Sequence, residues 1–156
     1  MSTSTITQYY EKDHDRLDGL FKTFQRLKKS DFKKAKEAFV AFKFGLQRHI
    51  IWEEEILFPI FEEKGGVSRD SGPTAVMRIE HRQIGQALEA VHQGVSRGST
   101  ETDSAENQLI SVLKQHNLKE ESILYPAIDN FLCDEERGGV FHKMENLPPE
   151  RYEKCC

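Results

Sequence analysis

The amino-acid sequence predicts an all-α protein: an antiparallel up-down four-helix bundle made of two repeated helical hairpins, with a short C-terminal tail. Three observations lead to this prediction. The chain is rich in helix-forming residues and has ten Phe, and it has no stretch that alternates polar and apolar residues as a strand does. One segment carries a heptad-type apolar pattern. The sequence also repeats itself in register at an interval of 67 residues.

Length and charge restrict the class of protein. The 156 residues suit a single domain, 1–156, with the bundle at about 7–132 and the tail at 133–156. The net charge is −4 and no basic stripe occurs, so nucleic acid is not an expected partner. No apolar run is long enough for a membrane span and the polar start is unlike a signal peptide, so we expect a soluble cytoplasmic protein. The three cysteines include no CxxC pair, which favours reduced thiols over a cysteine zinc site.

Capping and helix-breaking residues predict the limits of the elements. Ser30 is the expected N-cap of the second helix, and Gly65-Gly66 is expected to end it. Pro73 suits the first turn of the third helix. In the tail we expect one short helix at 140–144, stopped by Pro148-Pro149, and a frayed end. The four long helices are expected at about 7–29, 30–64, 73–96 and 101–132.

The second helix shows the heptad-type pattern, with a spacing that alternates between three and four residues. Its members are Phe32, Ala35, Phe39, Phe42, Leu46, His49, Glu53, Ile56 and Ile60. His49 and Glu53 belong to this apolar stripe, so they are predicted to face the bundle interior. Pro59 is predicted to kink the last turns. Trp52 and Phe44 lie off the stripe and are expected on the exposed face.

The internal repeat aligns without a gap. It pairs Asp13-His14 with Glu80-His81, His49 with His116, Glu53-Glu54 with Glu120-Glu121, and Ile56-Leu57-Phe58-Pro59 with Ile123-Leu124-Tyr125-Pro126. The repeating unit is a helical hairpin whose first helix supplies one His and whose second supplies His-x-x-x-Glu. Two such hairpins packed face to face bring both sets of side chains to one central axis.

Six residues of this repeat are the candidate metal ligands: His14, His49, Glu53, His81, His116 and Glu120. Residues at i and i+4 lie on one helix face, and burying such polar groups without partners is costly unless cations compensate them. Six ligands are too many for one tetrahedral zinc ion and too rich in nitrogen for calcium or magnesium. Imidazole with carboxylate suits iron or manganese, and also zinc. We therefore expect two ions, each with two imidazoles, bridged by the two carboxylates and by an oxo or hydroxo group, with an open position on each ion.

Neighbouring residues are expected to have lesser roles. Tyr10 and Met77 are repeat mates that would close the pocket or fill the core. Asp13 and Glu80 could support a ligand from behind or be solvated. We expect Glu54, Glu55 and Glu121 to be solvated. His92 and His142 are expected to be surface or packing residues.

These motifs resemble the hemerythrin family, specifically the bacterial HHE type, over roughly residues 7–132. The resemblance implies a non-haem di-iron centre with bridging carboxylates and capping histidines. The oxygen-carrying hemerythrins have a further His where this chain has Met77, and an Asp where it has Glu120. One fewer His leaves both irons under-ligated, which argues against reversible oxygen carriage.

The resemblance therefore favours a di-iron protein that interacts with a small oxidant, namely peroxide, O2 or NO, in oxidative or nitrosative stress. Two alternatives stay open. One is a non-enzymatic module that senses iron or oxygen. The other is iron storage or delivery, for which Cys155-Cys156 is the only hint in the sequence.

Overall fold

The structure, a computed structural model, describes residues 4–153, and all of its regular elements within that range are helical. The all-α prediction is confirmed. The elements are α1 (Ile6–Leu27), α2 (Phe32–Trp52), η1 (Glu53–Leu57), α3 (Phe58–Gly65), α4 (Pro73–Ser96), α5 (Asp103–Lys119), η2 (Glu120–Leu124), α6 (Tyr125–Phe131), α7 (Asp134–Asn146) and α8 (Glu150–Glu153). Between residues 4 and 153, none of the helices is long and apolar enough to cross a membrane.

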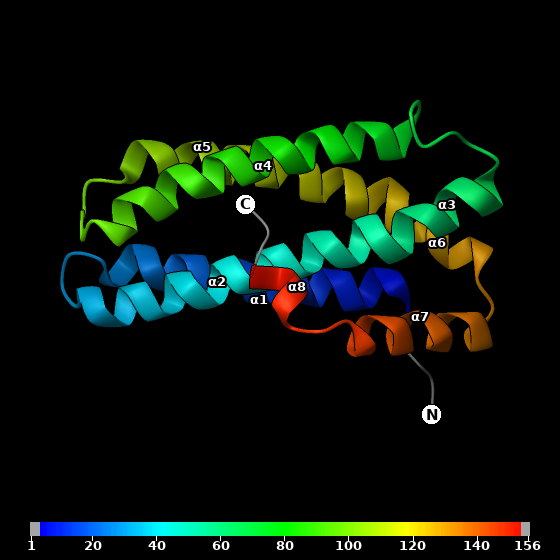
Figure 1. The fold of residues 1–156 in the computed structure, drawn as a ribbon, viewed down its shortest axis with the longest axis horizontal. Coiled ribbons are helices and arrows are strands. Elements are labelled where there is room, and N and C mark those ends of the chain that lie inside the picture. The colour runs from blue at the N-terminus through cyan, green and yellow to red at the C-terminus, as the bar shows by residue number, and fades with distance from the viewer. Residues whose placement is uncertain (1–3, 154–156) are drawn as a thin grey trace.

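Two helical hairpins lie side by side (Figure 1). Helix α1 packs along α2, and α4 packs along α5. The hairpins meet through contacts of α1 with α6, of α3 with α6 and of α2 with α4. Each hairpin corresponds to one copy of the sequence repeat. Two separate clusters of buried apolar side chains result, one around Phe24, Phe39 and Leu88 and the other around Tyr10, Phe58 and Tyr125.

Local chemistry explains where the helices begin and end. Thr5 caps α1 in a capping box with Gln8. The prediction that Ser30 caps α2 was wrong by one residue, because the carboxylate of Asp31 accepts a hydrogen bond from the Lys34 N–H at 3.2 Å. Helix α3 ends at Gly66, whose φ of 64° lies in the left-handed region that favours glycine.

The second and fourth long helices were predicted to be continuous α-helices, but both are interrupted. Each contains a five-residue π-helical turn, η1 or η2, that begins at the Glu of its His-x-x-x-Glu motif. The N–H of Phe58 bonds to the carbonyl of Glu53, five residues back, and the N–H of Tyr125 bonds to that of Glu120. A proline follows each of these residues, and proline lacks the N–H that would continue the α-helical ladder. The distortion predicted at Pro59 therefore takes the form of a widened turn just before it.

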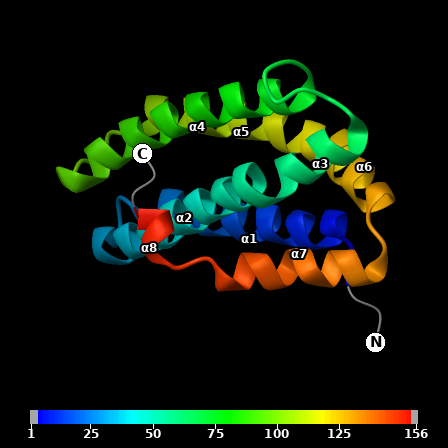
Figure 2. The same ribbon diagram turned by 45° about the vertical axis from the view of Figure 1, so that its right-hand side comes forward.

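The tail is more structured than predicted. Instead of one short helix at 140–144, it forms α7 and α8, which lie against the first hairpin (Figure 2). The Trp52 indole N–H donates to the Tyr152 hydroxyl at 2.7 Å, and the Phe44 ring lies 5.5 Å from the Tyr152 ring. The expectation that Trp52 and Phe44 face solvent was wrong, because this tail covers them. Cys155-Cys156 lies outside the described residues.

Candidate metal centre

The structure brings all six candidate ligands together between the two hairpins, and all six are buried. They form two groups that share Glu120, and the donor atoms of each group lie within 4.8 Å of one another. The first group is His14, His49 and Glu120, and the second is Glu53, His81, His116 and Glu120. Each group thus contains the two histidines of one hairpin, as the repeat predicts. Such buried groups of imidazoles and carboxylates are consistent with a metal site.

Each of the four imidazoles is held from behind by a carboxylate. The Nδ1 atom lies 2.9 Å from Glu121 in His14, 2.8 Å from Asp13 in His49, 2.7 Å from Glu54 in His81 and 2.8 Å from Glu80 in His116. A carboxylate can only accept a hydrogen bond, so each Nδ1 carries the proton. This arrangement fixes the tautomer and directs the Nε2 lone pair into the centre.

These contacts correct one expectation and decide another. Glu54 and Glu121 were expected to be solvated, yet each accepts a hydrogen bond from a histidine of the opposite hairpin. Glu55 is exposed, as expected, and pairs with Arg151 of the tail. Asp13 and Glu80, for which a supporting role and a solvated role were both open, support His49 and His116. The four supporting acids are themselves two pairs of repeat mates.

The six candidate ligands turn atoms that can act as acceptors toward the centre. The Nε2 atoms of His14 and His49 are 3.1 Å apart, and so are those of His81 and His116. Glu53 Oε1 and Glu120 Oε2 are buried and have no hydrogen-bond partner among the described residues. Glu120 Oε2 nevertheless lies 3.1 Å from His116 Nε2. Ligand lone pairs that converge in this way fit a pair of cations, so the residues present are suited to the metals that the sequence predicts.

The pKa values of these groups show how the metal-free centre compensates its charge. Burial lowers the pKa of His49, but the charge of Glu53 and hydrogen bonds to Asp13 and Glu120 outweigh it and raise that pKa to about 10. Burial, together with the nearby charge of Glu120, raises the pKa of Glu53 well above its usual range. Protons therefore occupy the centre at neutral pH when cations are absent.

Tyr125 adds a hydroxyl to the centre. Its oxygen lies 2.8 Å from a carboxylate oxygen of both Glu53 and Glu120, and 3.2 to 3.3 Å from Nε2 of His49 and His14. The π turn places Tyr125 there, because its N–H bonds to the carbonyl of Glu120 one widened turn earlier. In the other repeat Phe58 takes the same position and stacks on His81, with ring centroids 5.5 Å apart. At this position the two halves of the centre therefore differ by one hydroxyl group.

Comparison with known families agrees with this geometry. The family model described as the Hemerythrin HHE cation binding domain matches residues 5–128. The chain belongs to this family. The resemblance inferred from the motifs is thereby confirmed.

Among the curated relatives of this HHE-domain protein is the iron-sulfur cluster repair protein YtfE of Yersinia pseudotuberculosis, 35% identical over 91 residues, or 52% of this chain and 40% of that protein. The Edwardsiella ictaluri protein of the same name is 26% identical over 136 residues, or 78% of this chain and 61% of that protein. The chain therefore spans less than two thirds of the length of these relatives. No solved structure matches it.

The other predicted residues of the HHE domain lie where they were expected. Tyr10 is fully buried with its ring 4.7 Å from that of His49, and Met77 is buried nearby. His92 packs beside Phe39, and His142 is exposed on α7. The sequence analysis missed the hydroxyl of Tyr125, although its place in the repeat, where Phe58 is the mate, was visible.

Proposed function

We propose that this protein is a non-haem di-iron protein that binds or turns over a small oxidant, namely peroxide, O2 or NO, in oxidative or nitrosative stress. The observation that carries the proposal is the set of six ligand side chains that face the centre. Four of them are imidazoles whose Nδ1 proton is donated to a carboxylate on the side away from the centre, which leaves Nε2 free to bind a metal. His14, His49, Glu53, His81, His116 and Glu120 would hold the ions.

The donor set supports iron. Each ion would take two imidazoles and carboxylate oxygen, and this mixture of nitrogen and oxygen suits redox-active first-row metals, with manganese or zinc as alternatives. When bound, two iron ions would supply electrons and open coordination positions for a small oxidant. Six protein donors shared by two ions leave coordination incomplete, which favours reaction with a small molecule over a closed structural site.

The surrounding residues would prepare the centre for this chemistry. The four supporting acids orient the imidazoles and increase their basicity. Tyr125 holds an O–H group beside both glutamates, where it can donate a hydrogen bond or a proton. Tyr10, Leu57 and Phe58 are fully buried beside the centre and exclude water from that side.

The proposal is tested by the rate of peroxide loss. Protein loaded with iron is mixed with hydrogen peroxide, and the rate is compared with that of the same amount of free iron. His49→Ala is expected to abolish the excess rate, because it removes one of the two imidazoles in the first ligand group. His142→Ala is the matched control, since His142 is exposed on α7, and it should keep the full rate. A wild-type rate no higher than that of free iron, together with a visible spectrum unchanged by azide or NO, would contradict the proposal.

A second candidate function, iron delivery during iron–sulfur cluster repair, is favoured by the name of the relatives. The test is transfer of iron from the loaded protein to an apo iron–sulfur protein. Transfer faster than from free iron, without peroxide loss, would favour delivery over oxidant chemistry. Peroxide loss without transfer would favour the first proposal.

A further inference from the structure

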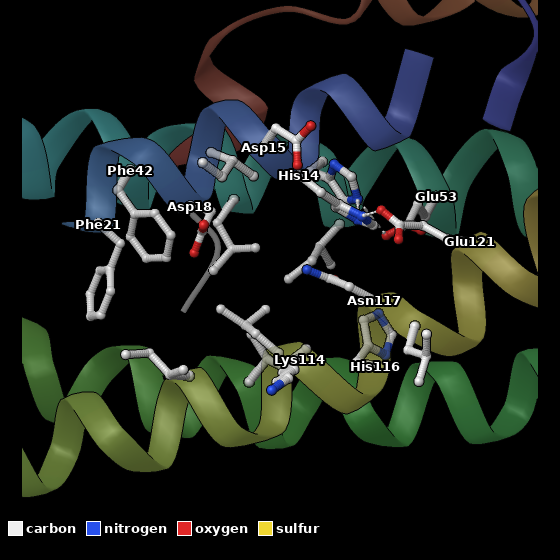
Figure 3. A pocket seen from close by; sticks show the side chains of 18 of the residues that line it. His14, Asp15, Asp18, Phe21, Phe42, Glu53, Lys114, His116, Asn117 and Glu121 are labelled. Carbon is white, nitrogen blue, oxygen red and sulfur yellow. Dashed lines mark hydrogen bonds and ion pairs between the residues drawn. The ribbon is translucent and has the colours of Figure 1, made fainter. Parts of the chain in front are cut away.

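A cavity of about 560 Å³ lies between the two hairpins, on the side where α1 faces α5 (Figure 3). Its inner end is formed by members of both ligand groups, among them His14, His49 and His116. Phe21 and Phe42 line it farther from the ligands. The cavity therefore leads directly to the candidate metal centre.

The walls of this cavity are apolar over most of its length. They are formed by Leu17, Phe21, Phe42, Leu46, Ile50, Ile84, Ile110 and Leu113. Ile110 is 37% exposed and Leu113 is half-buried, although both are large apolar side chains. An apolar chain of a ligand would cover such side chains and remove them from water.

The opposite side of the centre is closed. Tyr10 and Tyr125 are fully buried there, with ring centroids 4.8 Å apart. Leu57, Phe58 and Leu124 fill the space behind them. The cavity between α1 and α5 thus offers a route by which a ligand could reach the centre, and its volume lies in the range that holds drug-sized molecules, roughly 300–1,000 Å³.

We propose that this cavity binds an unbranched medium-chain amphiphile, such as a fatty acid, with its anionic oxygen headgroup at the metal centre and its chain along the apolar walls. The proposal rests on the metal centre of the proposed function and adds a class of ligand much larger than a diatomic molecule.

Charge sets the orientation of the ligand. Outside the ligand set, the charged side chains that line the cavity are Asp15, Asp18 and Glu121, against Lys22 and Lys114, and Glu121 lies at the inner end against His14. Lys22 is already paired with Asp18, its Nζ lying 2.8 Å from a carboxylate oxygen. The remaining charges, those of Asp15 and Lys114, balance each other. Bound cations at the inner end would attract an anion.

Calorimetric titration of the metal-loaded protein separates the two parts of the ligand. Decanoate carries headgroup and chain, acetate the headgroup alone and decanol the chain alone. Each buried methylene strengthens binding by about fourfold, so decanoate is expected to bind at least about 100-fold more tightly than acetate even if only half of its eight additional methylenes are buried. Decanoate should also bind more tightly than decanol, and more tightly to loaded than to metal-free protein.

Substitutions in the cavity wall test whether the ligand occupies this cavity. Leu113→Trp fills the cavity from its half-buried wall and should weaken decanoate binding by about tenfold or more while leaving metal content and acetate binding unchanged. Ile110→Trp, at a more exposed position on the wall, is the second variant in case Leu113→Trp does not fold. Ile123→Trp is the matched control, because Ile123 is 64% exposed and does not line the cavity.

The outcomes of these binding experiments can be told apart from those that test the proposed function. Equal affinity for decanoate and acetate, or decanoate binding unaffected by both cavity variants, would overturn the proposal even if the loaded protein consumed peroxide. Equal affinity for decanol and decanoate, or for loaded and metal-free protein, would overturn the assigned headgroup position. Tight, cavity-dependent binding of decanoate by iron-loaded protein that does not consume peroxide faster than free iron would support the ligand site and contradict the oxidant chemistry.

Discussion

Replacing Asp13 by Asn tests how the centre is built. The Asp13 carboxylate is 8% exposed, and its Oδ2 accepts the Nδ1 proton of His49 at 2.8 Å. Its other oxygen is held by Arg16. The neutral amide is a weaker acceptor, and its NH2 group favours the wrong tautomer of His49, with the proton on Nε2. Loss of such a supporting contact costs about 10–100-fold in metal affinity, or roughly 1.4–2.7 kcal/mol.

The four supporting acids give the prediction an internal order. Asp13 and Glu80 are 8% and 15% exposed, whereas Glu121 and Glu54 are 31% and 34% exposed. Water can replace an exposed acceptor more readily than a buried one, so Asp13→Asn and Glu80→Gln should weaken binding more than Glu121→Gln and Glu54→Gln.

Competition for iron(II) against a chromophoric chelator measures these affinities, with circular dichroism as the check on folding. Asp70→Asn, in the exposed loop before α4, is the control and should bind iron as the wild type does. The reasoning is refuted if Asp13→Asn keeps wild-type affinity, or if Glu54→Gln weakens binding as much as Asp13→Asn.

Four further predictions concern the metal, the protons, Tyr125 and the tail. Metal at 100 times its Kd should raise the stability by about 2.7 kcal/mol and Tm by roughly 5–10 °C in calorimetry, and an unchanged Tm would contradict a buried site. Because the pKa of His49 is raised to about 10, the metal-free centre is protonated at pH 7, so metal uptake should release protons and strengthen from pH 6 to 8. Calorimetry in two buffers of different ionisation enthalpy measures that release, and no proton release would contradict the assignment of these residues as metal ligands. Tyr125→Phe removes the hydroxyl bonded to both glutamates and should destabilise the metal-free protein by about 1–3 kcal/mol in urea unfolding. The metal-loaded protein should lose less stability, and an equal loss in both forms would argue against a role of this hydroxyl in the metal-free centre. Tyr152→Phe leaves the buried Trp52 N–H without its acceptor and should cost about 1–3 kcal/mol, whereas no loss would mean that the tail does not stabilise the bundle.

The sequence repeat was sufficient to predict the six candidate ligands as one group. Two residues four apart on a helix share a face, and a duplicated hairpin brings both faces to one axis, so His49 with Glu53 and His116 with Glu120 had to converge. The structure places all of them together. Periodicity works here because α2 and α5 are regular α-helices up to the ligand glutamates, where the π turns begin.

Contacts between hairpins were harder to predict. Glu54 and Glu121 follow the ligand glutamates, and α-helical periodicity turns them away from the site. Each reaches a histidine from the opposite hairpin instead, a contact that no spacing within one helix describes. The fact that the two are repeat mates, as His14 and His81 are, was the available signal.

The π turns and the tail escaped prediction for different reasons. Pro59 and Pro126 signalled a distortion, but a kink and a widened turn have the same sequence signature. The tail contains Gly138-Gly139, which has low helix propensity, and its second helix forms just after Pro148-Pro149. Burial of Tyr152 against the bundle outweighs this local preference.

Counting the metal ions bound per chain tests the di-iron proposal without assuming any activity. The protein is purified without added metal from cells grown in iron-replete medium, and metals are counted per chain by mass spectrometry with the visible spectrum recorded alongside. We expect close to two irons per chain, with absorption bands that change on adding azide, and clear loss of metal in His116→Ala. A wild-type chain that folds stably and holds no metal would contradict the proposal, because the buried acceptors would then be satisfied in some other way.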